Sequence, residues 1–174
     1  RKNAAIFGER WGKLGDQLGM LYGGIDSKAV TERATDPSGA MGAIQRILSN
    51  DIACRQTLKD FARPAAERRL FPNIEPDVLP GSSPEADSQI RAAIAHLHEL
   101  VLGRYDDNSA EINRSFDLFA GIIADAQMQK GLDKRENYHC RANIPDAPED
   151  PHYTIRAWRG VITYLLRRQD FLYE

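Results

Sequence analysis

Apolar residues recur at three- and four-residue intervals along most of this chain. The first such stripe lies between positions 7 and 21 and is followed by Gly23 and Gly24, which favour a turn. Apolar positions that step by three and four share one face of a helix. The pattern therefore predicts a first helix whose inner face holds Phe7, Trp11, Leu14, Leu18 and Leu21.

Pairs of a capping residue and a proline mark further helix starts. The side-chain oxygen of Asp or Ser accepts an unpaired backbone N–H, and a proline in the first turn gives up only an amide that has no partner there. These pairs are Asp36-Pro37, Ser83-Pro84 and Asp150-Pro151, with Asn108 or Ser109 as a further cap. Each start precedes an apolar stripe, so the sequence predicts about five helices.

The stripes that follow these starts give the expected inner faces. In chain order they are Met41, Ile44, Leu48, Ile52, Leu58 and Phe61; Ile90, Ile94, Leu97 and Val101; Ile112, Phe116, Phe119, Ile123 and Ala126; and Ile155, Trp158, Ile162 and Leu165. We expect the second, third and fourth helices to end near Ala62, Gly103 and Gly131, where proline or glycine follows the stripe.

Two long connections separate the predicted helices. Residues 71–83, "FPNIEPDVLPGSS", hold three prolines and a glycine, and residues 131–150 are polar and contain proline. No segment alternates apolar and polar residues between hairpin turns, so no sheet is expected. The sequence thus predicts an all-α fold, an irregular bundle of about five amphipathic helices with long proline-rich connections.

Composition fits a single globular domain over 1–174. The 174 residues are 42% hydrophobic and 28% charged, and the formal net charge is -2, which is ordinary for a packed domain. Because the chain starts at Arg1, we expect a processed product or part of a longer chain. The arginines form no basic run, so nucleic acid is not an expected partner. No apolar run reaches the roughly 18 residues of a transmembrane segment.

The two cysteines, Cys54 and Cys140, are far apart in the chain, and Cys140 follows His139 in "ENYHCRAN". Attachment of c-type haem needs two cysteines separated by two residues and followed by histidine, which this stretch lacks. Zinc ligands usually come in closely spaced pairs, which are also missing. In an oxidising compartment we therefore expect one long-range disulfide, Cys54–Cys140, which would contribute about 4 kcal/mol in the chain-entropy model. Two separate thiols are the alternative.

The sequence contains no complete catalytic motif, so we assign no catalytic residue, cofactor or metal. His96 and His98 are two positions apart on a helix and point in different directions, so they do not chelate one ion. His152 is expected in a first helical turn. A polar site formed by His96, His139 and His152 in the folded chain is the alternative, and it would make the protein a metal- or haem-dependent redox enzyme subunit.

The last helix and the aromatic tail carry the expected partner contacts. Arg156 and Arg159 flank Trp158, and the tail "DFLYE" adds Phe171 and Tyr173. The arginines could hold an anionic partner or pair with acids of the same chain. The tail has no evident core of its own, and such aromatic segments often lie against a neighbour.

Three stretches together resemble a known group of proteins. They are "LYGGIDSKAVTERATDP", "IRAAIAHLHELVLGRYDDNSAEINRSFDLF" and "DPHYTIRAWRGVITYLLRRQDFLYE". From about Leu21 to its end, the chain resembles the C-terminal helical region of planctomycete-type secreted cytochrome c-associated proteins, a region of unknown function. The resemblance implies an exported bacterial protein, periplasmic or at the cell surface, with a c-type cytochrome as a partner. The haem-attachment motif of those proteins is absent from this sequence, so no haem ligand is carried over.

The helical pattern and the resemblance together predict a non-catalytic helical docking or structural module, and the resemblance implies that it belongs to an exported protein or redox-associated assembly. Its partner is a protein or a neighbouring domain. The redox enzyme subunit is the first alternative. A cytosolic regulatory bundle with reduced cysteines is the second.

Overall fold

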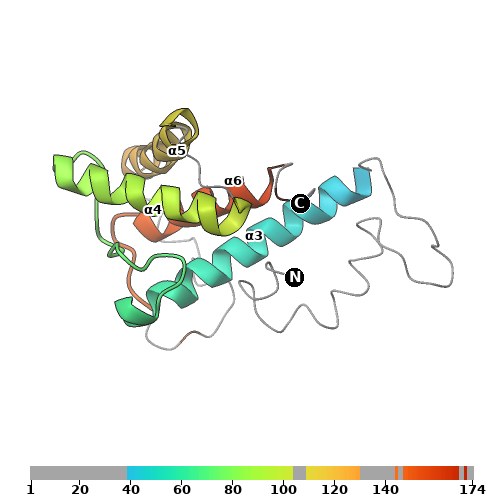
Figure 1. The fold of residues 1–174 in the computed structure, drawn as a ribbon, viewed down its shortest axis with the longest axis horizontal. Helices are drawn as coiled ribbons and strands as arrows, with labels where there is room; N and C mark the ends of the chain where they lie inside the picture. The colour runs from blue at the N-terminus through green and yellow to red at the C-terminus, as the bar shows by residue number, and fades with distance from the viewer. Residues whose placement is uncertain (1–38, 104–108, 130–143, 145–146, 169–170, 172–174) are drawn as a thin grey trace, which may run out of the picture. The chain divides into compact units, whose positions relative to one another are not determined.

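The computed structural model describes residues 39–103, 109–129, 144, 147–168 and 171. Over these residues the chain is helical and contains no strand (Figure 1). The helices are α3 (Gly39–Phe61), α4 (Pro84–Leu102), α5 (Ser109–Met128) and α6 (Thr154–Leu166), with a short 3-10 helix at Ala65–Glu67. The all-α prediction is confirmed with four helices in the described part instead of about five. The predicted helix over 7–21 lies outside it.

Close packing divides the chain into two units, 1–49 and 50–174, and their boundary lies within α3. Of the first unit, only 39–49 are described, and they are helical. The second unit holds the rest of α3 and the other three described helices. The single-domain interpretation of 1–174 stays a prediction, because residues 1–38 and the expected Asp36-Pro37 cap lie outside the described residues.

The segment 50–61 of α3 buries a face that differs from the predicted one. Ile52 is half-buried. The buried positions of this segment are Ala53, Thr57, Leu58, Asp60 and Phe61. Leu58 and Phe61 were expected at buried positions. The hydroxyl of Thr57 and the carboxylate of Asp60 were not, because a sequence pattern assigns polar residues to the solvent side.

Asp60 is buried because its carboxylate organises the connection after α3. It accepts three successive backbone N–H groups, from Arg69 at 3.0 Å, Leu70 at 2.9 Å and Phe71 at 3.0 Å. A buried carboxylate is tolerated when donors surround it in this way. The connection is thereby attached to the end of α3.

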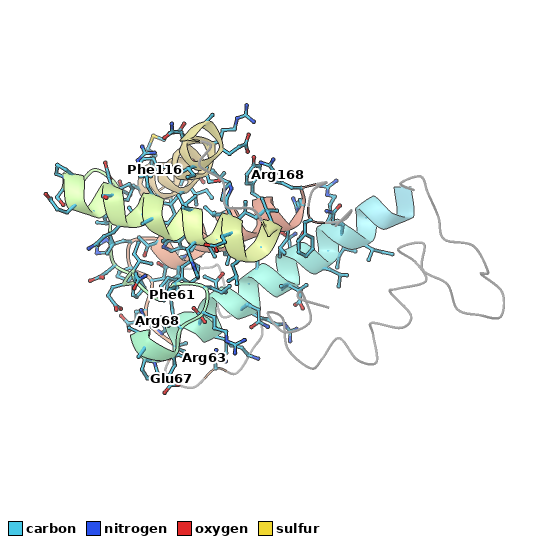
Figure 2. The ribbon with its side chains drawn as sticks, viewed as in Figure 1. Phe61, Arg63, Glu67, Arg68, Phe116 and Arg168 are labelled. Atoms are coloured by element: carbon cyan, nitrogen blue, oxygen red, sulfur yellow. The ribbon has the colours of Figure 1, made fainter. Side chains whose placement is uncertain are left out.

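Arg68, which lies in this connection near Phe61 (Figure 2), makes a second set of contacts that hold it. Its Nε donates to the carbonyl of Arg63 at 2.9 Å. Its Nη1 donates to the carbonyl of Ile74 at 3.2 Å and to the carboxylate of Glu75 at 3.0 Å. The guanidinium carbon lies 5.6 Å from the ring centre of Phe61. The proline-rich connection is thus fixed by specific contacts on the surface of the bundle.

Helix α4 begins and ends as its local sequence predicts. The side chain of Ser83 accepts the backbone N–H of Ala86 at 3.1 Å, and Pro84 occupies the first turn. Gly103 has φ 67 and its N–H bonds the carbonyl of Glu99 at 3.0 Å, which is a common helix ending for glycine. The predicted stripe is buried at all four positions, Ile90, Ile94, Leu97 and Val101.

Helices α4, α5 and α6 pack against one another in the second unit (Figure 1). The α5–α6 contact is the most extensive and includes Gly160, where an added Cβ would overlap the Cδ1 of Ile122. Of the predicted α5 stripe, Phe119 and Ile123 are buried, and Ile112, Phe116 and Ala126 are half-buried. Two helices therefore approach closely where one of them has no side chain.

A chain of aromatic rings forms the centre of this unit. Trp158 of α6 is 0% exposed. Its ring centre lies 4.4 Å from that of Phe119 on α5 and 5.1 Å from that of Phe71. Phe71 in turn stacks on Phe61 at 4.3 Å. The rings thus join α5, α6, the end of α3 and the connection after it.

Helix α6 begins at Thr154, three residues later than the Asp150-Pro151 signal predicts. Pro151 and His152 lie in a turn before the helix, so the placement of His152 in the first helical turn was wrong. The carboxylate of Asp150 still acts as a cap, because it accepts the backbone N–H groups of Ile155 at 3.0 Å and Arg156 at 3.2 Å. The cap therefore reaches from Asp150 across the turn at Pro151 and His152 to the first amides of α6.

Among the helices of the described segments, none combines the length and the apolar character that a bilayer crossing requires.

Candidate functional site

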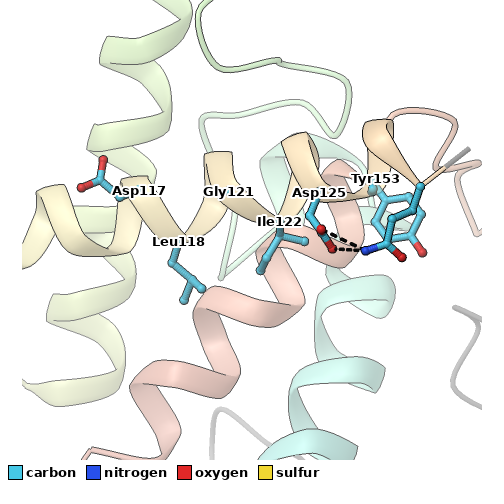
Figure 3. Close-up of a pocket in the computed structure, with 8 residues that line it drawn as sticks. Asp117, Leu118, Gly121, Ile122, Asp125 and Tyr153 are labelled. Carbon is cyan, nitrogen blue, oxygen red and sulfur yellow. Dashed lines mark hydrogen bonds between the residues drawn. The ribbon is translucent and has the colours of Figure 1, made fainter.

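A groove of about 400 Å³ runs along α5 and ends at the turn before α6 (Figure 3). We call it the α5 groove. It is lined by Asp117, Leu118, Gly121, Ile122, Asp125, Ala126, Gln129 and Tyr153. Its volume lies within the range of ligand and side-chain binding sites.

The α5 sequence places these residues on one face. Seven of them lie at positions 117, 118, 121, 122, 125, 126 and 129, and residues three and four apart are neighbours on a helix surface. The apolar members are Leu118, Ile122 and Ala126, and at Gly121 a Cβ would have no atom within 4 Å. The missing side chain at Gly121 thus leaves the groove open at its middle.

Two carboxylates mark the length of the groove. Asp117 lies toward one end of the row, and Asp125 lies beside Tyr153 toward the other (Figure 3). Both are exposed. The side-chain amide of Gln129 donates to both oxygens of Asp125 at 2.9 Å. Within the described ranges neither carboxylate has an ion-pair partner, so both keep acceptor capacity for a ligand.

Tyr153 is held at the groove end in an unusual backbone conformation. Its φ of 67 is the only positive φ of a non-glycine residue in the described part of the chain. A bulky residue in this region costs about 1–3 kcal/mol, and such residues persist where the surroundings fix them. Here the guanidinium of Arg156 lies 3.4 Å from the ring centre. The carbonyl of Tyr153 accepts the N–H of Ala157 at 2.9 Å.

Arg156 is in turn fixed by a buried ion pair. Its Nε lies 2.8 Å from the carboxylate of Asp150, and its Nη2 donates to the Asp150 carbonyl at 2.8 Å. The residue is only 7% exposed. Its charge is therefore used within the fold, to orient Tyr153 and the start of α6. Pairing with an acid of the same chain is one of the two roles that the sequence left open for Arg156, and a contact with a partner protein stays a prediction.

No family model, curated protein or solved structure matches this chain.

The other predicted contact residues have different outcomes. Arg159 is half-buried, and its Nη1 donates to the sulfur of Cys54 at 3.4 Å. Phe171 is half-buried, and its N–H bonds the carbonyl of Arg168 at 3.2 Å. Tyr173 lies outside the described residues. A role for Arg159 and Phe171 toward a partner stays a prediction.

The two α4 histidines point in different directions, as their spacing predicts. The Nε2 of His96 lies 2.8 Å from the carbonyl of Arg69, so the ring N–H holds the connection after α3. His98 is fully buried, and its Nε2 lies 3.0 Å from the hydroxyl of Ser115 on α5. Both contacts join structural elements.

The predicted histidine site is not assembled from the described residues. His96 contacts the connection after α3, and His152 is exposed in the turn before α6. His139 lies outside the described residues. Across the described ranges, no group of three or more histidine, cysteine, aspartate or glutamate side chains is arranged to hold a metal ion.

Cys54 is half-buried on α3 and does not stand as a free thiol in the structure. Its predicted partner, Cys140, lies outside the described residues. The Cys54–Cys140 disulfide therefore stays a prediction, and the contact from Arg159 shows only what lies next to its α3 end.

A second polar cluster joins the start of α5 to the end of α6. Glu111 pairs with Arg168 and, at 3.0 Å, with Arg114. The hydroxyl of Tyr164 donates to Glu111 at 3.5 Å. The hydrogen bond from Arg168, followed by its charge and that of Arg114, lowers the pKa of Glu111 below its usual 4.5 despite partial burial. This cluster ties two helix ends together.

Sequence reasoning missed the α5 groove and the role of Tyr153. The polar residues Asp117 and Asp125 are eight positions apart on a helix with Gly121 midway between them, and this spacing was a usable signal for one shared face. The conformation of Tyr153 left no local signal, because the buried Asp150–Arg156 pair beside its ring is a contact of the folded chain and matches no turn motif.

Proposed function

We propose that this chain is a non-catalytic docking module that holds a partner protein in the α5 groove. The observation that carries the proposal is Tyr153, which is kept in a strained conformation at the end of an open groove by a buried ion pair. A strained residue at a concave surface is a reason to infer function there.

The residues around the groove favour binding over chemistry. They offer an apolar floor at Leu118 and Ile122, and hydrogen-bonding groups at Asp125 and Gln129. An apolar site with a few fixed polar groups is typical of recognition.

The exposed Met128 supports docking at the same place. Its side chain is 78% exposed at the end of α5, and it lies three residues beyond Asp125, on the adjoining part of the helix surface. Methionine adapts its shape to different partners and is common at binding surfaces. A partner that covers the groove would also cover Met128.

For the cellular setting we propose export to the periplasm or cell surface, with a c-type cytochrome as a candidate partner. The resemblance of three sequence stretches to secreted cytochrome c-associated proteins supports this setting. The state of Cys54, which is not a free thiol, also supports it, because disulfides persist in oxidising compartments.

Site-specific photocrosslinking in cells of the native source tests the docking function. A photoreactive amino acid at Met128 is expected to link the chain to one defined protein, and the same group at Glu67, exposed in the 3-10 helix, is expected not to. The linked protein is then identified and mixed in purified form with the unmodified chain to confirm binding.

A variant that fills the groove is compared with a matched variant elsewhere in the chain. Gly121→Leu places a side chain where a Cβ meets no atom within 4 Å, so the fold is expected to stand while the crosslink from Met128 drops at least tenfold. Gly42→Leu, at an equally open position of α3, is expected to leave the crosslink unchanged. Equal crosslinking in both variants, or equal yields from Met128 and Glu67, would contradict docking at this groove.

A further inference from the structure

We propose that the α5 groove binds an extended segment of a partner protein in which two cationic side chains flank an apolar one, with one residue between each. This inference rests on the proposed docking function and names the chemistry of the partner. Three observations support it: the charges of the groove, its hollow middle and the distance between its carboxylates.

The charges of the groove are all negative. Asp117 and Asp125 are its charged side chains, and in the described ranges no cation pairs with either. The third carboxylate of α5, Glu111, is already paired with Arg168 and Arg114. A partner side chain with a positive charge therefore complements each end, and a carboxylate in the same place would be repelled.

The middle of the groove accepts an apolar side chain. At Gly121 the space beyond the backbone is open, and Leu118 and Ile122 border it on the same helix. Ile122 is half-buried and supported from below by its close contact with Gly160. A side chain of the size of leucine would remove these apolar surfaces from water.

The spacing of the carboxylates selects an extended segment. Asp117 and Asp125 are eight positions apart on α5, and a rise of 1.5 Å per residue separates them by about 12 Å along the axis. In an extended chain, side chains at i, i+2 and i+4 lie on one face, and the outer two are about 13 Å apart. A cation, an apolar residue and a cation at these positions therefore match the groove.

A titration followed by ¹⁵N–¹H NMR of the full chain tests this chemistry. The probe is a blocked seven-residue peptide of alternating alanine, with lysine, leucine and lysine at its second, fourth and sixth positions. We expect shifts concentrated at the amides of Gly121, Ile122 and Asp125, with affinity in the millimolar range that falls as salt is raised.

Variants and a second peptide supply the controls. Asp117→Asn with Asp125→Asn is expected to weaken binding at least tenfold. The double change Asp77→Asn with Glu99→Gln removes the same charge from exposed sites outside the groove and is expected to change affinity less than twofold. Replacing both lysines of the peptide by glutamate is expected to abolish the shifts. Equal binding of the two peptides, or unchanged binding by the Asp117–Asp125 variant, would overturn the proposal.

The peptide titration and the crosslinking experiment can fail independently of each other. A Met128 crosslink that depends on Gly121, together with no shifts from the lysine peptide, leaves the docking function and rejects the cationic partner. Charge-dependent peptide binding without any crosslink from Met128 supports the ligand chemistry and rejects docking in the cell.

Discussion

Two buried carboxylates, Asp60 and Asp150, hold irregular backbone in the described part of the chain. Asp60 accepts three successive amides of the connection after α3, and Asp150 accepts two amides at the start of α6. An ionised carboxylate is acceptor-only and can satisfy several N–H groups at once. Single residues therefore fix segments whose own sequences do not define a regular structure.

At the residue scale, Glu111 gives a pH-dependent prediction. Its pKa is lowered in the folded chain, chiefly by the hydrogen bond from Arg168. A lowered pKa stabilises the fold at pH values above the usual 4.5, and this stabilisation is lost as the pH falls through the folded value. Glu111→Gln is expected to lower the free energy of unfolding by about 1 kcal/mol at pH 7. Chemical denaturation at pH 7 and below 4.5 measures this.

The free energy of unfolding of Glu111→Gln is expected to approach that of the natural chain steadily below pH 4.5, because Glu111 becomes neutral in both the folded and the unfolded chain. Glu99→Gln, at an exposed position of α4, is the control and is expected to change the free energy of unfolding by less than about 0.5 kcal/mol. A difference that stays constant as the solution is acidified would show that the charge of Glu111 does not contribute.

At the scale of elements, local signals predicted α4 well and α6 less well. The Ser83 side chain accepts the N–H of Ala86, three residues ahead, so its capping role can be recognised in a short window of sequence. Asp150 caps α6 across a turn that requires Tyr153 in a left-handed conformation. That turn is stabilised by Arg156 folding back, a contact that no helix-start rule contains. The groove on α5 was missed because a turn from another segment completes it.

The start of α6 should therefore depend strongly on Asp150. Asp150→Asn removes the carboxylate charge that pairs with the buried guanidinium of Arg156, and removing one member of a buried pair typically costs about 3–5 kcal/mol. We expect a loss in that range in chemical denaturation, and faster hydrogen exchange at the amides of Ile155 and Arg156. Ser83→Ala, which removes a partly buried cap of α4, is expected to cost only about 1 kcal/mol.

A matched double change separates the pair from the helix cap. If the loss reflects an unpaired charge, Asp150→Asn combined with Arg156→Met is expected to be less destabilising than the sum of the two single changes. A purely additive result would show that the capping hydrogen bonds of Asp150, and not its pairing with Arg156, carry the effect.

At the scale of the whole molecule, the predicted disulfide would join two distant parts of the chain. The predicted Cys54–Cys140 bond closes a long loop, and its reduction is expected to lower the free energy of unfolding by about 4 kcal/mol. Denaturation with and without reductant measures this, and Cys54→Ser should match the reduced protein. Intact mass after alkylation is expected to show no free thiol before reduction. Two alkylated cysteines in protein freshly isolated from its native source would contradict both the bond and an oxidising compartment.

The aromatic core also sets the order in which the newly made chain can close. Trp158 lies in α6, the last of the described helices, and the rings it touches, Phe71 and Phe119, leave the ribosome earlier. Until α6 is synthesised, Phe71 and Phe119 lack the indole that they contact in the folded chain, and their apolar surface stays open to chaperones. The 50–174 unit can therefore complete its core only after α6 has been synthesised, and a chaperone that binds the nascent chain before then binds a unit whose core still lacks Trp158.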